Sequence, residues 1–159
     1  MINTYKAKIT MPSDRELIIT REFAAPATVL YEALTKPEHV REWYGPRVMK
    51  LLVCDIDLRV GGRWRYVVQG PDGSQHGFSG EYKELVPAQR IVSTEGYEGM
   101  PGTDYLATVT LTEQGGKTML TNHLVYQMKE HRDGHVASGM EGGMNETYDR
   151  LDEVVAQSE

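Results

Sequence analysis

Residues 18–46 constrain the fold of this chain more than any other stretch. The stretch opens with an apolar run typical of a β-strand, and Pro26 then marks the start of a helix, because proline fits the first helical turn. A second short helix follows and ends before Gly45-Pro46, a pair that stops helices. The first helix has an apolar face formed by Leu30, Ala33 and Leu34. Few small folds open with a strand and two helices and then continue with strands.

The rest of the chain predicts several strands and one long final helix. Between Val48 and Tyr126 the sequence contains six strand-like segments, separated by turn signals such as Gly61-Gly62. Apolar and small residues then recur every three or four positions: Val136, Met140, Gly143, Met144, Thr147, Leu151 and Val154. We therefore predict an α+β fold of order β-α-α-β6-α, in which an antiparallel seven-stranded curved sheet wraps around a long C-terminal helix.

Three further segments resemble a known family. The segments are residues 57–64, 76–82 and 137–153. Together with the opening stretch, they are similar to bacterial proteins related to the C-terminal domain of the activator of Hsp90 ATPase. Those proteins belong to the START-like (SRPBCC) superfamily, which has the helix-grip or Bet v 1-like fold. The resemblance extends from about Arg15 to Val155. It implies the fold, but the superfamily includes lipid carriers, hormone receptors, cyclases and co-chaperones, so the fold alone assigns no function.

The composition is that of a single acidic domain. Lys and Arg number 17 against 23 Asp and Glu, and the net charge of −6 argues against nucleic acids and anionic membranes as partners, because both need a basic patch. Cys54 is the only cysteine, and neither a membrane-spanning run nor a signal peptide is found. We expect a cytoplasmic protein with one START-like domain over residues 15–159 and a loosely ordered segment over residues 1–14.

Side-chain alternation predicts which residues of the central hairpins face inward. A three-residue loop pairs Leu58 with Trp64 and places Asp57 beside Arg65 on the outer face. A two-residue loop instead mixes charged residues into the apolar face. The inward-facing set predicted for the two strands that follow is Trp64, Tyr66, Val68, His76, Phe78, Gly80 and Tyr82.

Two registers are open for the last hairpin. A four-residue loop over residues 114–117 pairs Val109 with Asn122, which turns Asn122 inward and leaves His123 outside. The alternative register turns His123 inward instead. The first register is favoured, and with it a polar amide on the inner face of the sheet.

Two features favour a cavity beneath the final helix over a solid core. The chain contains nine Tyr but only two Phe, and tyrosine combines an apolar ring with a hydroxyl that suits an amphipathic ligand. Gly139, Gly142 and Gly143 lie in the predicted helix, where each costs roughly 1 kcal/mol relative to alanine. Ordinary core packing is the alternative for each residue. The candidate ligand-binding residues are Trp64, Tyr66, His76, Phe78, Tyr82, Val109, Leu111, Leu120, Asn122, Met140 and Met144.

The sequence contains no recognisable catalytic, cofactor or metal motif. His131 and His135 have the i, i+4 spacing of paired metal ligands, but no third ligand accompanies them, so no metal site is predicted. No glycine-rich motif for a phosphate or dinucleotide is present, and no cofactor is expected. If the protein is an enzyme, His76 and Tyr82 are the candidates for proton transfer, with Asn122 as a polarising donor.

Three functional hypotheses follow. The leading one is a protein that binds a small apolar or amphipathic ligand in the cavity. The resemblance implies a second, a START-like enzyme of the cyclase, dehydratase or hydrolase type that acts in the same cavity. It also implies a third, a cofactor of an Hsp90-type chaperone. A monomer and a homodimer are both compatible with the sequence.

Overall fold

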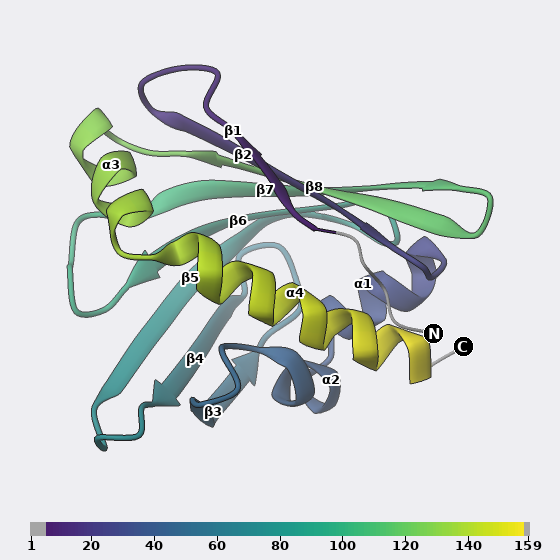
Figure 1. Ribbon diagram of the computed structural model, residues 1–159, viewed down its shortest axis with the longest axis horizontal. Helices are drawn as coiled ribbons and strands as arrows, with labels where there is room; N and C mark the ends of the chain where they lie inside the picture. Colours follow the sequence, from purple (N-terminus) through teal and green to yellow (C-terminus); the bar gives the residue numbers. More distant parts are fainter. Residues whose placement is uncertain (1–5, 158–159) are drawn as a thin grey trace.

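The computed structural model describes residues 6–157, within which eight strands form one sheet and four helices accompany it (Figure 1). The strands are β1 Lys8–Thr10, β2 Glu16–Phe23, β3 Lys50–Ile56, β4 Arg63–Gln69, β5 Gln75–Val86, β6 Arg90–Tyr97, β7 Tyr105–Gln114 and β8 Lys117–Val125. The helices are α1 Ala27–Thr35, α2 Pro37–Trp43, α3 Lys129–Ala137 and α4 Met140–Gln157.

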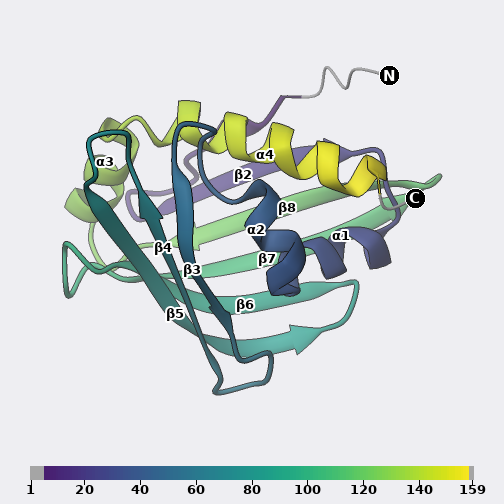
Figure 2. The same ribbon diagram turned by 90° about the horizontal axis from the view of Figure 1, so that it is seen from below.

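The sheet has the order β1-β2-β8-β7-β6-β5-β4-β3 and is antiparallel throughout. It bends strongly, so that β3, β4 and β5 run at a steep angle to β2, β8 and β7 (Figure 2). This architecture confirms the α+β helix-grip fold. The sheet has one strand more than expected, because Lys8–Thr10 pairs with β2 inside the segment predicted to be loosely ordered. Residues 1–5 of that segment lie outside the described residues.

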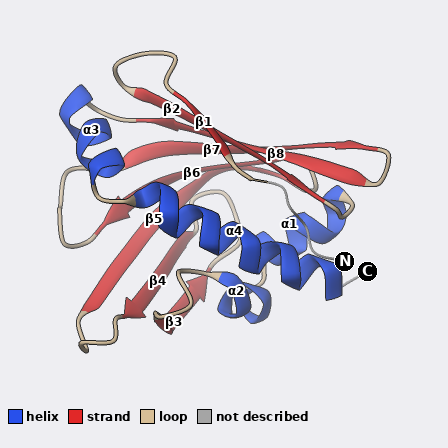
Figure 3. Ribbon diagram, in the orientation of Figure 1, coloured by secondary structure: helices blue, strands red, loops and turns tan. Residues whose placement is uncertain are grey.

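Helices α1, α2 and α4 lie on the concave side of the sheet, with α4 running across its opening (Figure 3). The Arg150 guanidinium of α4 donates to the backbone oxygens of Gly45, at 2.7 Å, and Glu42, at 2.9 Å, and so attaches α4 to the end of α2. Within residues 6–157, no helix is long and apolar enough to cross a membrane.

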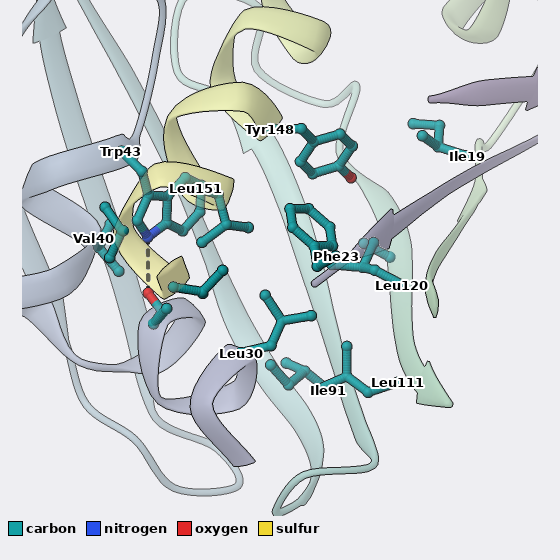
Figure 4. Packing of buried hydrophobic residues seen from close by; sticks show 14 of the residues in the cluster. Ile19, Phe23, Leu30, Val40, Trp43, Ile91, Leu111, Leu120, Tyr148 and Leu151 are labelled. Atoms are coloured by element: carbon teal, nitrogen blue, oxygen red, sulfur yellow. Dashed lines mark hydrogen bonds between the residues drawn. The ribbon is translucent and has the colours of Figure 1, made fainter. Parts of the chain in front are cut away.

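The core fills the space beneath α1 and the C-terminal half of α4 (Figure 4). Phe23 meets Tyr148 edge to face, with ring centroids 5.8 Å apart. The indole Nε1 of Trp43 donates to the Ala33 carbonyl oxygen at 2.8 Å, so this buried donor is satisfied. Leu30 of α1 is completely buried between these groups and the sheet. This end of the molecule is therefore packed solid.

A charged side chain, that of Arg21, is buried in this core. Arg21 occupies an inward-facing position of β2 and is only 2% exposed. Its guanidinium donates to Asp149 at 3.0 Å, lies 3.8 Å from Asp152, and sits 4.6 Å from the centre of the Phe23 ring. Because an unpaired buried cation is costly, these contacts to α4 oppose any movement of the helix away from the sheet.

The last hairpin has the register favoured from the sequence. Val109 pairs with Asn122, and Asn122 faces the interior. The imidazole Nε2 of His123 instead contacts the Glu16 carboxylate at 2.7 Å, which confirms that His123 lies away from the concave face. Gly115 and Gly116 form the turn with φ values of +62° and +79°, a left-handed pair that glycine adopts readily.

The β3–β4 hairpin differs from the predicted register by two residues. Its pairs are Ile56–Trp64 and Asp55–Arg65, in place of Leu58–Trp64 and Asp57–Arg65. The loop between the two strands is longer than predicted. The Asp57 N–H donates to the Arg63 carbonyl oxygen at 2.9 Å, and the chain turns between these two residues, through Gly61. Because a shift of two residues preserves the alternation of side chains, Trp64 still faces inward. Strand β4 pairs with β5, as expected for two strands whose inward-facing residues share one face of the sheet.

The predicted final helix is interrupted, so the expectation of one continuous helix from about Val136 was wrong. Helix α3 ends at Ala137 and α4 begins at Met140. Gly139 lies between them with φ of +83°, the left-handed conformation that ends many helices. Gly139 therefore stops a helix instead of lying inside one.

Candidate functional site

A cavity of about 350 Å³ lies between the concave face of the sheet and the N-terminal half of α4. Its apolar wall comprises Ile19, Val68, Phe78 and Leu124 from the sheet, Pro46 and Met49 from the segment before β3, and Met140 and Met144 from α4. The space persists partly because Gly143 has no side chain there. A Cβ atom added at Gly143 would meet only the Pro46 ring, at 3.8 Å.

Five of the residues predicted from the sequence line this cavity: His76, Phe78, Asn122, Met140 and Met144. The other six do not line it: Trp64, Tyr66, Tyr82, Val109, Leu111 and Leu120. They belong to the packed core or lie against it. Tyr44, which does line the cavity, packs on Tyr66 with ring centroids 4.6 Å apart, and Trp64 lies behind Tyr66 at 4.9 Å. Tyr44 thus stands between the cavity and two of the predicted residues.

Glu95 also lines the cavity and was not identified from the sequence. Its carboxyl accepts a hydrogen bond from the Tyr105 hydroxyl at 2.8 Å. Burial raises the pKa of Glu95, and the Tyr105 hydrogen bond offsets the rise only in part. Alternation along β6 was the available signal, because Ile91 and Ser93 are buried on the same face as Glu95.

A second polar pair borders Tyr105. The Tyr126 hydroxyl and Nδ1 of His135 are hydrogen-bond partners at 2.6 Å, and the His135 ring lies 5.5 Å from the Tyr105 ring. Burial lowers the pKa of His135, so the neutral imidazole is favoured. His135 was considered from the sequence only as a metal ligand. It connects α3 to the sheet and contributes to the cavity wall.

His76 and Asn122 bring polar groups from other strands. Nδ1 of His76 and the Tyr97 hydroxyl lie 2.8 Å apart, and the opposite ring nitrogen lies 3.2 Å from the Ser74 hydroxyl. Asn122 lies beside the Tyr148 hydroxyl, yet its Oδ1 atom is buried with no hydrogen-bond partner among the described residues. A buried acceptor of this kind is available to a donor on a ligand.

The described residues contain no cluster of three or more His, Cys, Asp and Glu side chains that could bind a metal ion. His135 instead contacts Tyr126 through its ring nitrogen. The cavity can therefore supply apolar contact, hydrogen bonds and proton transfer from its own side chains.

A second hollow, of about 400 Å³, is formed by β4, β5, β6 and residues 98–104. Its side chains are mostly polar, and Lys83 and Glu81 pair with each other there at 3.0 Å. Arg65 and Glu98 form a further ion pair beside it, at 2.8 Å. Because these charges are already paired, the cavity beneath α4 is the stronger candidate for a binding site.

Comparisons with known proteins agree with the fold. The family model described as "Activator of Hsp90 ATPase homolog 1-like protein" matches residues 24–156. A crystal structure of a Rhodobacter sphaeroides protein is 31% identical, with 97% of this chain and 100% of that chain covered and a TM-score of 0.88. A Nitrosomonas europaea protein is 25% identical, with 93% and 98% covered and a TM-score of 0.83. No curated protein matches the chain significantly.

Proposed function

Because the chain belongs to the activator of Hsp90 ATPase homolog 1-like family and has its START-like fold, we propose that it binds a small apolar or amphipathic molecule beneath α4. One observation carries the proposal, namely a cavity of about 350 Å³ with an apolar wall and a few polar groups. Small-molecule sites usually have this form. A guest of matching shape would gain dispersion contacts with the apolar side chains of the wall.

Binding of the neutral fluorescent dye Nile red tests this proposal, together with native mass spectrometry of protein purified without delipidation. We expect one saturable dye site per chain and competition between the dye and any co-purified molecule. The absence of saturable dye binding, with no co-purified molecule, would contradict the proposal.

Two neighbouring glycines of α4 provide a matched pair of variants. In Gly143→Leu the new side chain enters the cavity, whereas a Cβ at Gly142 meets nothing within 4 Å. Both substitutions favour the helix by roughly 0.5–1 kcal/mol, so neither should unfold the protein. We expect Gly143→Leu to weaken dye binding roughly tenfold or more, because the cavity becomes overpacked, and Gly142→Leu to leave it unchanged. Equal dye binding by both variants counts against the site.

The same cavity favours a second candidate, a START-like enzyme. Glu95 and His135 have pKa values shifted in opposite directions, and both line the cavity. Titratable groups of this kind often mark acid–base sites. Of the candidates named from the sequence, His76 and Asn122 line the cavity, whereas Tyr82 does not. Incubation with each molecule identified by mass spectrometry tests this hypothesis, and an unchanged mass after incubation removes it for that molecule.

A further inference from the structure

Glu95 is the only Asp, Glu, Lys or Arg among the described residues that line the cavity. Tyr105 donates the only side-chain hydrogen bond that its carboxyl receives from the described residues. Several acidic groups elsewhere in the fold pair with bases, as Glu98 pairs with Arg65 at 2.8 Å and Asp149 with Arg21 at 3.0 Å. The cavity therefore contains a carboxyl group that forms no ion pair with any base in residues 6–157.

Aromatic rings surround the same space. Tyr44, Phe78, Tyr105 and Tyr148 all line the cavity. Aromatic faces attract a cation that lies within about 6 Å of the ring centre, and cages of such rings bind alkylated ammonium groups. Rings and a carboxylate together provide the two kinds of contact that an organic cation uses in a desolvated site.

The Asn122 side chain adds an independent indication. Its Oδ1 atom is buried without a partner among the described residues, and Asn122 lines the cavity. Oδ1 can only accept a hydrogen bond, as can the carboxylate of Glu95. Asn122 Oδ1 therefore favours a hydrogen-bond donor on the guest, and the Glu95 carboxylate can accept a second hydrogen bond beside the one from Tyr105.

From this arrangement we propose that the cavity is selective for an apolar amine, a molecule with a hydrocarbon body and one protonated amino group. The proposal rests on the proposed function and adds the chemistry of the guest's head group. The Glu95 carboxylate pairs with the ammonium group, and the hydrocarbon lies against Val68, Leu124 and the two methionines of α4. A guest that ends in a carboxylate is excluded, because like charges repel strongly where water is scarce.

Four probes with the same octyl chain test the selectivity: octylammonium, octyltrimethylammonium, 1-octanol and octanoate. Their affinities for the full chain are measured at neutral pH by isothermal titration calorimetry. Because the hydrocarbon is constant, differences report the head group alone. We expect octylammonium to bind at least about tenfold more tightly than 1-octanol and octanoate to bind most weakly. Octyltrimethylammonium should fall between octylammonium and 1-octanol, because it has the charge but no N–H donor.

The variant Glu95→Gln assigns the selectivity to one carboxylate. It should weaken octylammonium binding by at least about tenfold and leave the affinity for 1-octanol within about twofold of the wild-type value. Glu84→Gln is the matched control, because Glu84 lies outside the cavity lining and pairs with Arg90 at 2.8 Å. The control should leave all four affinities unchanged.

The outcomes separate this inference from the proposed function. If Nile red binds but 1-octanol or octanoate equals the cations in affinity, amine selectivity is overturned and small-molecule binding stands. If Nile red and all four probes fail to bind, both are overturned. If Glu95→Gln proves unfolded by circular dichroism, the order of the four probes on the wild-type protein still decides.

Discussion

Glu95 occupies an inward-facing position of β6 where an apolar side chain would be easier to bury. Burial disfavours its ionised form, which is why its pKa is raised despite the hydrogen bond from Tyr105. Sites that bind or react commonly contain such locally unfavourable residues, because their chemistry requires them. The proposed amine selectivity accounts for a carboxyl group at this position, which burial alone disfavours.

Replacing Glu95 by Gln should remove a pH-dependent loss of stability. The folded-state pKa is raised above the unfolded value of about 4.3. The folded state therefore binds the proton more tightly, and wild-type stability falls as the pH rises through the interval between the two pKa values. The stability of Glu95→Gln lacks this decrease, because the amide does not titrate.

Urea unfolding of both proteins between about pH 4 and about pH 8 measures the effect. The free energy of unfolding of Glu95→Gln, relative to wild type, should rise with pH. Subtracting the free energies of unfolding of the two proteins removes the contributions of other titrating groups, including His135. A difference that does not change with pH would show that burial does not raise the pKa of this carboxyl.

Sequence reasoning identified part of the cavity and overlooked its charged residue. Asn122 was placed inward by alternation and register, and Met140 by helical spacing. Glu95 was overlooked because carboxylates are almost always exposed, so the hydrophobic pattern gives no reason to turn one inward. His135 was overlooked because its wall position depends on α3 ending at Ala137. A hydrophobic pattern therefore does not identify an inward-facing carboxylate, even where it places neighbouring side chains correctly.

At the scale of elements, the break between α3 and α4 shows how a periodic pattern conceals a helix end. Apolar residues recur at helical spacing through Val136 and Met140, yet the backbone reverses its φ sign at Gly139. Helix α3 has no fully buried residue, so its own packing does little to fix its position. The hydrogen bond between Tyr126 and His135 is one contact that holds α3 against the sheet.

Gly139→Ala is expected to destabilise the protein by roughly 1–2 kcal/mol, because alanine is strained at φ of +83°. Gly134→Ala is the matched control inside α3, where an added Cβ meets nothing within 4 Å. It should stabilise the protein by roughly 0.5–1 kcal/mol. Thermal unfolding followed by circular dichroism measures both. If Gly139→Ala were as stable as the control, a continuous helix would be the better description of this segment.

The hairpins show which element features a sequence specifies firmly. Alternation placed Trp64 and Asn122 on the correct face, because a slip of one residue would turn an apolar set toward water. Alternation does not specify the length of a loop, and the predicted β3–β4 register was wrong by two residues. That length depends on backbone hydrogen bonds such as Asp57 to Arg63, which the side-chain pattern does not reveal.

At the scale of the whole molecule, the fold followed from element order and family resemblance, but the position of the cavity did not. The sequence predicted a hollow along the final helix. The structure confines it to the N-terminal half of α4, because Phe23, Leu30 and Leu151 fill the other end (Figure 4). Which part of a curved sheet is filled depends on the combined volume of side chains from many elements, and periodicity does not report volume.

A bound guest should stabilise the whole domain. At a free concentration of about 100 times Kd, a ligand that binds only the folded state adds about 2.7 kcal/mol to the free energy of unfolding. For a chain of this length, that corresponds to a rise in Tm of roughly 5–10 °C. Differential scanning fluorimetry with octylammonium measures the shift, which Gly143→Leu should largely abolish. An equal shift in that variant would place the ligand elsewhere.

The two ends of α4 have different tasks. Leu151 and Val155 at one end are fully buried, whereas Met140 and Met144 at the other are only partly buried against the core and also line the cavity. Substitutions at the cavity lining should therefore cost less stability than substitutions at the fully buried end. If the cavity binds a ligand as proposed, evolution can change the preferred ligand through a few substitutions at the lining, while the packed end of α4 keeps the fold intact.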